Sequence, residues 1–292
     1  MGNEFEKVAM KVSMVSIVWN VVLSLFKLFA GIVANSTAMI SDAVHSASDV
    51  FSSIIVMIGV KISRRAEDHD HPYGHERFEC MASLLLAVVL AATGLGIGYS
   101  AIVKLLSGEY HSTIPGTLAL IAAVVSIVVK EAMFWYTRYY AKKIDSGAVM
   151  ADAWHHRSDA LSSVGALIGI SGAMLGFPIM EPLASIVICL FIEKAAFDIS
   201  KDAMDKMVDK ACDEATENAL KKCALGVDGV QEVDLIKTRL FGNKIYVEME
   251  IGADENLTLK DSHAIAEKVH DSIESGWPKV KHILIHVNPV KI

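Results

Sequence analysis

Apolar residues gather into long blocks over residues 1–200 of this chain, and charged residues become frequent over residues 201–292. Most blocks are about 20 residues long or longer, the length that an α-helix needs to cross the hydrocarbon core of a bilayer. We predict six transmembrane helices from them, over approximately 9–33, 38–62, 79–106, 115–137, 149–174 and 178–198. The pattern therefore indicates a polytopic α-helical membrane protein.

Basic residues alternate between the two ends of the predicted helices. The links over 34–37, 107–114 and 175–177 contain no Lys or Arg, whereas the links over 63–78 and 138–148 carry six. Because basic loops stay on the cytoplasmic side of a membrane, we expect both termini to be cytoplasmic. No transit or sorting signal is evident, so we expect a multi-pass protein of the cell inner membrane.

The segment after the last block has the pattern of a small α/β domain. Apolar and polar residues alternate along 244–251, and Thr258 and Asp261 have the spacing of a capping box that opens a helix. The predicted elements are a helix over 212–225, strands over 230–240 and 244–251, a helix from 258 to about 275, and a strand over 282–288.

This αββαβ order predicts an open-faced α/β domain, ferredoxin- or metallochaperone-like. We therefore divide the chain into a six-helix transmembrane domain over 1–205 and a cytoplasmic metal-sensing and dimerisation domain over 206–292. A domain of about 85 residues is only modestly stable alone, and we expect it to pair with a second copy as a homodimer.

Composition supports a membrane protein and limits the partners. Hydrophobic residues make up 53% of the 292 residues, and the mean hydropathy of +0.41 is too high for an ordinary soluble domain. The net charge of −7 argues against a nucleic-acid partner. The four cysteines form no Cys-x-x-Cys pair, so neither a thiolate zinc site nor a redox motif is expected. We expect no prosthetic group.

Two predicted spans carry the same polar motif, Asp-Ala-x-His-x-x-Ser-Asp, once over 42–49 and once over 152–159. An Asp at the centre of a bilayer costs about 2.5 kcal/mol or more, so such residues usually mark a pathway or a site. The His and Asp of each copy are four residues apart and share one helix face.

Two imidazoles and two carboxylates suit a divalent transition metal. We therefore predict a mid-membrane metal site formed by His45, Asp49, His155 and Asp159. The alternative is that each pair only joins neighbouring helices. Asp152, like Asp42 in the first copy, lies one turn from the ligands and is expected to accept hydrogen bonds from the histidines or to line a pathway.

Other polar residues in the spans carry weaker signals. Asn20 is expected to join helices. Lys130 and Glu131 are expected to pair with each other or with another span, without a functional role. Arg157 needs a carboxylate partner that the sequence does not identify.

The link between the second and third spans contains a second cluster of potential ligands. Asp68, His71 and His75 have metal-ligand character, His69 and Asp70 add to it, and a proline and a glycine shape a turn between the ligands. We predict a cytoplasmic metal site at Asp68, His71 and His75. The alternative is a solvated polar loop.

The tail contains a third candidate. His286 lies two residues before Asn288, on a strand expected beside the strand of Glu250, and Asp234 and His263 would complete a site. The alternative is that these are surface residues without a ligand.

These motifs resemble the cation diffusion facilitator family of divalent-metal/proton antiporters, over essentially the whole chain. The resemblance rests on the two His-x-x-x-Asp pairs, the His-Pro-Tyr-Gly-His link over 71–75, the six spans and the αββαβ tail. It implies a homodimer with paired tails, four transport ligands in each protomer and a site in the link. Asn288 departs from it, since members usually have an Asp ligand there.

The two-His, two-Asp set resembles the zinc-selective pattern of this family. We therefore expect a secondary active transporter that exports Zn²⁺ by alternating access while H⁺ moves inward, with Zn²⁺ also acting as a regulatory ion. Export of Fe²⁺ or Mn²⁺ is the alternative. A membrane-anchored metal sensor is a remoter one. An intramembrane metalloenzyme is disfavoured, because four protein ligands leave no open coordination position.

Overall fold

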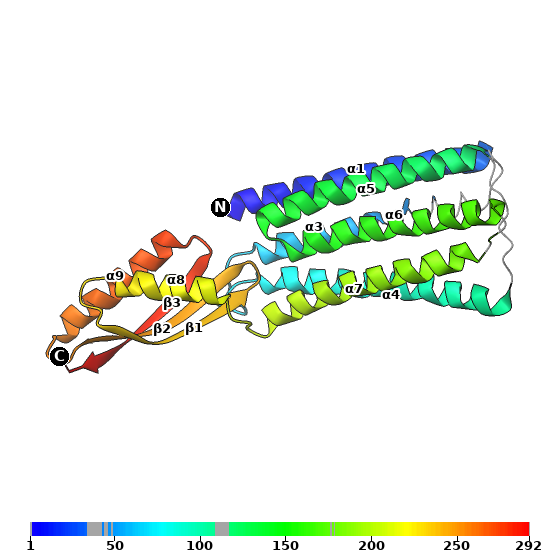
Figure 1. Ribbon diagram of the computed structural model, residues 1–292. Helices are drawn as coiled ribbons and strands as arrows, with labels where there is room; N and C mark the ends of the chain where they lie inside the picture. Colours follow the sequence, from blue (N-terminus) through cyan, green and yellow to red (C-terminus); the bar gives the residue numbers. More distant parts are fainter. Residues whose placement is uncertain are drawn as a thin grey trace. The chain divides into compact units, whose positions relative to one another are not determined.

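A computed structural model of the chain describes residues 2–33, 43, 46–47, 49–108, 117–175, 177 and 179–291 (Figure 1). It divides into two compact units, Met1–Ala203 and Met204–Ile292. The first unit is helical, and the second combines helices with a three-stranded sheet.

Each of the six predicted spans overlaps one of the long helices within the described ranges. These helices are α1 (Gly2–Val33), α3 (Val50–Ser63), α4 (Arg77–Ser107), α5 (Thr117–Ile144), α6 (Gly147–Met174) and α7 (Met180–Met207). All except α3 have at least 28 residues. At about 1.5 Å per residue each is longer than the roughly 30 Å hydrocarbon core of a bilayer.

Side chains in the first unit are distributed in the opposite way to those of a soluble domain. Charged groups such as Lys130, Asp49 and Asp152 are buried inside the bundle, whereas Phe29, Phe51 and many other large apolar side chains are exposed. Among the described helices, α1 and α4 are also long and apolar enough to cross a membrane by length and composition. An apolar exterior around a polar interior is the arrangement of a transmembrane domain.

Small residues let the helices approach closely. A Cβ atom at Gly59 in α3 would collide with the Cβ of Ala82 in α4, and one at Gly98 would lie 2.6 Å from Cys189 Sγ in α7. Helix α6 contacts α3, α4 and α5, and α1 contacts α3 and α5. Four helices, α1, α3, α5 and α6, therefore surround the polar interior.

The second unit has the predicted αββαβ order. Its elements are α8 (Glu214–Leu225), β1 (Glu232–Phe241), β2 (Lys244–Asp254), α9 (Leu259–Gly276) and β3 (Val280–Val290). Strand β2 is central, antiparallel to β1 and parallel to β3. Helix α8 contacts β1 and α9 contacts β3, and the helices cover one face of the sheet (Figure 1).

The local signals that predicted these elements are visible in the structure. The Thr258 hydroxyl accepts a hydrogen bond from the Asp261 amide and caps α9. On β2, Val247 and Met249 are buried, as the alternation predicts. Tyr246, on the opposite face, is buried as well, because its ring lies beside those of Phe241 and His282.

Candidate metal centre

Three of the four predicted membrane ligands meet inside the helical bundle. Asp49 immediately precedes α3, and His155 and Asp159 lie one turn apart on α6. One ligand atom from each lies within 4.8 Å of the others. Asp49 is 3% exposed and His155 is 7% exposed. Two carboxylates and an imidazole therefore lie together in the interior of the bundle, largely shielded from solvent.

The His155 ring has a nitrogen available for a ligand. Its Nε2 lies 3.4 Å from Asp49 Oδ1, is buried, and makes no hydrogen bond within the described parts of the chain. A buried polar atom without a hydrogen bond is costly unless something else binds it. The three residues therefore fit a divalent cation. His45 and Asp42 lie outside the described residues, and His45 stays a predicted ligand.

Lys130 also lies in this cluster, although the sequence predicts no functional role for it. Its Nζ donates hydrogen bonds to Asp49 Oδ2 at 2.6 Å, to Asp159 Oδ2 at 2.8 Å and to Asn20 Oδ1 at 2.9 Å. Lys130 does pair with other helices, and two of its partners are the carboxylates that are predicted as metal ligands. The sequence alone did not assign this contact, because Lys130 lies off the centre of the span predicted over 115–137 and comes near a helix midpoint only with the observed bounds of α5.

The neighbouring Glu131 faces the other way and supplies the partner that Arg157 needs. Arg157 Nη2 lies 3.5 Å from Glu131 Oε1, and the guanidinium carbon lies 4.3 Å from the centroid of the Phe134 ring. Trp135 Nε1 also donates to Glu131 Oε1 at 3.0 Å. Arg157 is therefore part of an α5–α6 contact, away from the ligands.

A second polar cluster surrounds Asp152, one turn before His155 on α6. Its carboxylate accepts hydrogen bonds from Ser52 at 3.1 Å and Ser53 at 3.2 Å, both on α3. His156 Nε2 lies 3.6 Å from Asp152 Oδ2 and 3.2 Å from Ser16 Oγ of α1. Asp152 thus faces His156, and the cluster joins three helices.

The link between α3 and α4 brings Asp68, His71 and His75 together, again with one ligand atom of each within 4.8 Å of the others. The two histidine rings are 4.5 Å apart between centroids. His75 is 5% exposed, and its Nδ1 has no hydrogen-bond partner among the residues that the structure describes. His69 and Asp70 point into solvent.

Backbone hydrogen bonds hold the Asp68 carboxylate in place. Its Oδ1 accepts from the amide of His71 at 2.7 Å and from that of Asp70 at 3.1 Å. The His71 amide is the main reason why the pKa of Asp68 lies below its ordinary value of 3.8. An ionised carboxylate beside two imidazoles fits a divalent cation.

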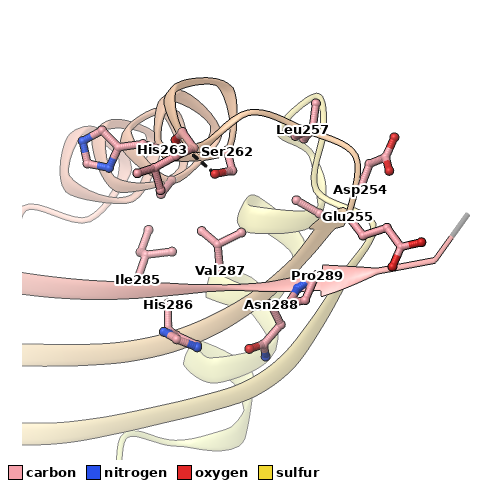
Figure 2. Close-up of a pocket in the computed structure, with 13 residues that line it drawn as sticks. Asp254, Glu255, Leu257, Ser262, His263, Ile285, His286, Val287, Asn288 and Pro289 are labelled. Carbon is pink, nitrogen blue, oxygen red and sulfur yellow. Dashed lines mark hydrogen bonds between the residues drawn. The ribbon is translucent and has the colours of Figure 1, made fainter.

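The four predicted tail ligands do not form one site in the structure. Successive strand residues point to opposite faces. In Figure 2, His286 and Asn288 lie on the side of β3 away from α9, whereas His263 lies on α9. His263 is paired instead with Glu267, 3.4 Å away. The prediction grouped residues by sequence position and did not account for the sheet that separates them.

The remaining tail carboxylates are bridged by an amide. Asn288 Nδ2 donates to Asp234 Oδ2 at 2.8 Å and to Glu250 Oε2 at 3.2 Å. Glu250 is paired in register with His286 across the β2–β3 ladder. Asn288 therefore takes the place that a cation would need between the carboxylates.

Comparison with known families agrees with the two units. The family model of the cation efflux transmembrane domain matches residues 13–208, and that of the cation efflux protein cytoplasmic domain matches residues 212–290. The chain belongs to the cation efflux family. This confirms the resemblance to cation diffusion facilitators, which are transporters, and it confirms a membrane domain followed by a cytoplasmic α/β domain.

Relatives of this cation efflux protein match along nearly its whole length. An uncharacterised transporter of Methanocaldococcus jannaschii is 39% identical over 275 residues, which cover 94% of this chain and 96% of the relative. The manganese efflux system protein MneP of Bacillus subtilis is 30% identical over 296 residues, which cover 99% of both. Among solved structures, the cadmium form of MamM CTD is 27% identical, covers 27% of this chain and 98% of its own, and has a TM-score of 0.26.

Proposed function

We propose that this cation efflux protein exports a divalent transition metal from the cytoplasm, with Asp49, His155 and Asp159 as transport ligands and His45 as the fourth. The supporting observation is the buried convergence of the three described ligands, one of which has a ring nitrogen without a hydrogen bond. Ionisable groups at this depth are costly and are expected to serve a transported ion.

Zn²⁺ is the cargo that the ligand set favours. Two imidazoles and two carboxylates can surround Zn²⁺ tetrahedrally and balance its charge. Mg²⁺ and Ca²⁺ are disfavoured because they prefer six or more oxygen ligands. Mn²⁺ is the second candidate, since a full-length relative is named as a manganese efflux protein, and Fe²⁺ export by the same route is a third.

Proton antiport follows from the chemistry of the ligands. A carboxylate or an imidazole must be unprotonated at the atom that binds metal. Metal and protons therefore compete for the same atoms. Alternating access would release metal outside and take up protons there, so that protons return inward through the same site. The basic links over 63–78 and 138–148 support cytoplasmic termini, and we place the chain in the cell inner membrane.

Regulation is assigned to the link cluster and the tail. We propose that Asp68, His71 and His75 bind metal from the cytoplasm, and that the domain over 206–292 pairs with a second copy in a homodimer. Metal binding at the link would then depend on the metal concentration in the cytoplasm, and it would regulate transport by the transmembrane domain over 1–205. Asp234, Glu250 and His286 are not assigned a metal in the native chain, because Asn288 bridges the carboxylates.

Uptake by proteoliposomes that contain the purified full chain tests the proposal. Zn²⁺, Mn²⁺ and Fe²⁺ are supplied separately, and Asp159→Asn is compared with Asp198→Asn, which alters an exposed carboxylate on α7. Metal uptake by the native chain and the Asp198 variant, but not by the Asp159 variant, is the expected result. No transport of any of the three metals, with metal binding retained, would instead favour the membrane-anchored sensor.

A further inference from the structure

The Lys130 ammonium contacts both of the proposed transport carboxylates that the structure describes. Lys130 is 2% exposed and ranks among the largest fully buried side chains of the chain. An ammonium has three N–H donors, and the three oxygens of Asn20, Asp49 and Asp159 accept all of them. The group is therefore a fully satisfied cation held between two carboxylates.

From this geometry we infer that Lys130 is a tethered cation that occupies the transport site when metal is absent and that metal must displace. The inference rests on the proposed function of the site. It makes Lys130 a residue that sets metal affinity and promotes metal release, a role beyond that of a ligand or a helix contact.

The ammonium and a metal ion compete for the same oxygens. Nζ lies 2.6 Å and 2.8 Å from one oxygen of Asp49 and one of Asp159, whereas zinc–carboxylate bonds are about 2.0–2.2 Å long. A metal bound to this pair would lie within a few ångströms of the ammonium. Two cations so close in a site largely shielded from water repel each other strongly, so the ammonium must leave when metal binds.

Lysine suits such a movement. Its charge sits at the end of a flexible four-carbon stem and can move without a change in the backbone. Asn20 on α1 is a third partner outside the carboxylate pair, and its Nδ2 is itself buried without a hydrogen bond in the parts that the structure describes. Asn20 can keep one hydrogen bond to the ammonium while the ammonium swings away from the carboxylates.

The exchange limits the charge that the site carries. Two carboxylates alone place two negative charges in the membrane interior, which is costly. The ammonium reduces this to one in the empty site. When metal binds and the ammonium leaves the site, the divalent ion alone balances both carboxylates. A returning ammonium also helps metal to leave, because it restores the partners of Asp49 and Asp159.

Metal binding by Lys130 variants of the purified full chain tests the inference. All variants also carry His71→Ala and His75→Ala, which remove the link site, and the same background with Asp159→Ala defines binding elsewhere. Lys130→Met removes the charge, Lys130→Gln removes it but keeps a hydrogen-bonding tip, and Lys130→Arg retains it. We expect Zn²⁺ to bind at least about tenfold more tightly to the Met and Gln variants than to the native background. The Arg variant should stay close to native.

If Lys130 had only a structural role, the neutral variants would not bind Zn²⁺ more tightly than the native background. These variants would unfold more easily and would bind metal equally or more weakly, and that result overturns the inference. If neither neutral variant folds, the native chain decides the question through its structure with and without Zn²⁺. Lys130 Nζ still within hydrogen-bond distance of both carboxylates in the zinc-bound state would refute displacement.

The same set of proteins separates this inference from the proposed function. Loss of transport in Asp159→Ala together with unchanged Zn²⁺ affinity in Lys130→Gln would leave the transport site standing and remove only the displacement. Transport that survives Asp159→Ala would remove both. Slower uptake by Lys130→Gln at saturating Zn²⁺, with tighter binding, is the expected signature of impaired release.

Discussion

The hydrogen bond between Ser53 of α3 and Asp152 of α6 can be measured by a double-mutant cycle, which separates it from the other contacts of Asp152. Ser53 is fully buried, and within the described residues Asp152 is the acceptor of its hydroxyl, at 3.2 Å and 3.3 Å from the two carboxylate oxygens. Ser52 has another acceptor, the Asp49 carbonyl at 2.7 Å. Asp152→Ala therefore leaves one buried hydroxyl without a partner.

The magnitude of the coupling follows from that hydroxyl. A buried donor that loses its partner costs about 1–3 kcal/mol, and a hydrogen bond to a charged group contributes about 1.5–3 kcal/mol. Asp152→Ala and Ser53→Ala should each destabilise the protein. The double variant should lose about 1–3 kcal/mol less than the sum of the two, because the cost of the broken bond is counted only once.

Reversible unfolding of the full chain in detergent micelles gives the four free energies of the cycle. Ser63→Ala provides the matched control, because Ser63 is buried on the same helix and its hydroxyl donates to the Val60 carbonyl at 2.9 Å. Combined with Asp152→Ala it should be additive within about 0.5 kcal/mol. Equal additivity for the Ser53 pair would refute the assignment of this bond.

Three further predictions concern the link and the tail. Because the pKa of Asp68 is lowered in the folded protein, the ionised Asp68 carboxylate stabilises the fold above the ordinary value of 3.8, and this effect is lost as the pH falls through the folded pKa. Hydrogen exchange, corrected for intrinsic rates, should therefore show that the His71 amide is protected at pH 7 and at pH 5 in the native chain. In Asp68→Ala the same amide should not be protected. Ile273→Ala, at a fully buried position of α9, should destabilise the tail by about 2–5 kcal/mol. Leu259→Ala, at a position that is 86% exposed, should change the stability of the tail little. Hydrogen exchange of the tail amides in the full chain compares the two variants, and equal effects would contradict the packing. Asn288→Asp should replace the bridging amide by a third carboxylate and raise the affinity of the tail for Zn²⁺ by about tenfold or more. Zn²⁺ titration of a chain without the link histidines measures this affinity. An unchanged affinity would show that the Asn288 amide does not prevent metal binding.

The order of elements could be predicted because it depends on local patterns. Apolar blocks of membrane-crossing length placed a helix in each of the six spans within the described ranges. The alternation along β2 and the capping box at Thr258 gave the tail its αββαβ order. Whether each helix of the first unit crosses a bilayer stays a prediction.

The convergence of three candidate metal ligands could be predicted for a similar reason. His155 and Asp159 are four residues apart, and the helical period alone brings them to one face. The repeated motif then indicated that Asp49 shares their site, and the structure places it there.

Lys130 could not be assigned in the same way. Its three partners come from α1, α6 and the residue before α3, and only the packing of four helices brings them to one point. A lone lysine in a span has several alternatives, such as extending to the membrane surface or pairing along its own helix. Its sequence neighbours do not distinguish between them.

The four tail residues do not come together in the structure, for a different physical reason. His286 and Asn288 lie on one face of β3, and α9 with His263 covers the other (Figure 2). Sequence distance alone contains no information about which face a helix covers. The bridging by Asn288 could have been anticipated only from the register of β2 and β3, which pairs Glu250 with His286 and Gly252 with Asn288.

The central claim is that one buried site carries both metal and protons, and simultaneous recording of Zn²⁺ uptake and internal pH in proteoliposomes tests it most directly. The native chain is compared with the double variant Asp49→Ala/Asp159→Ala. The account predicts that the native chain moves Zn²⁺ inward while protons leave, and that the double variant moves neither. Zn²⁺ uptake by the double variant, or uptake by the native chain without any proton movement, would contradict it.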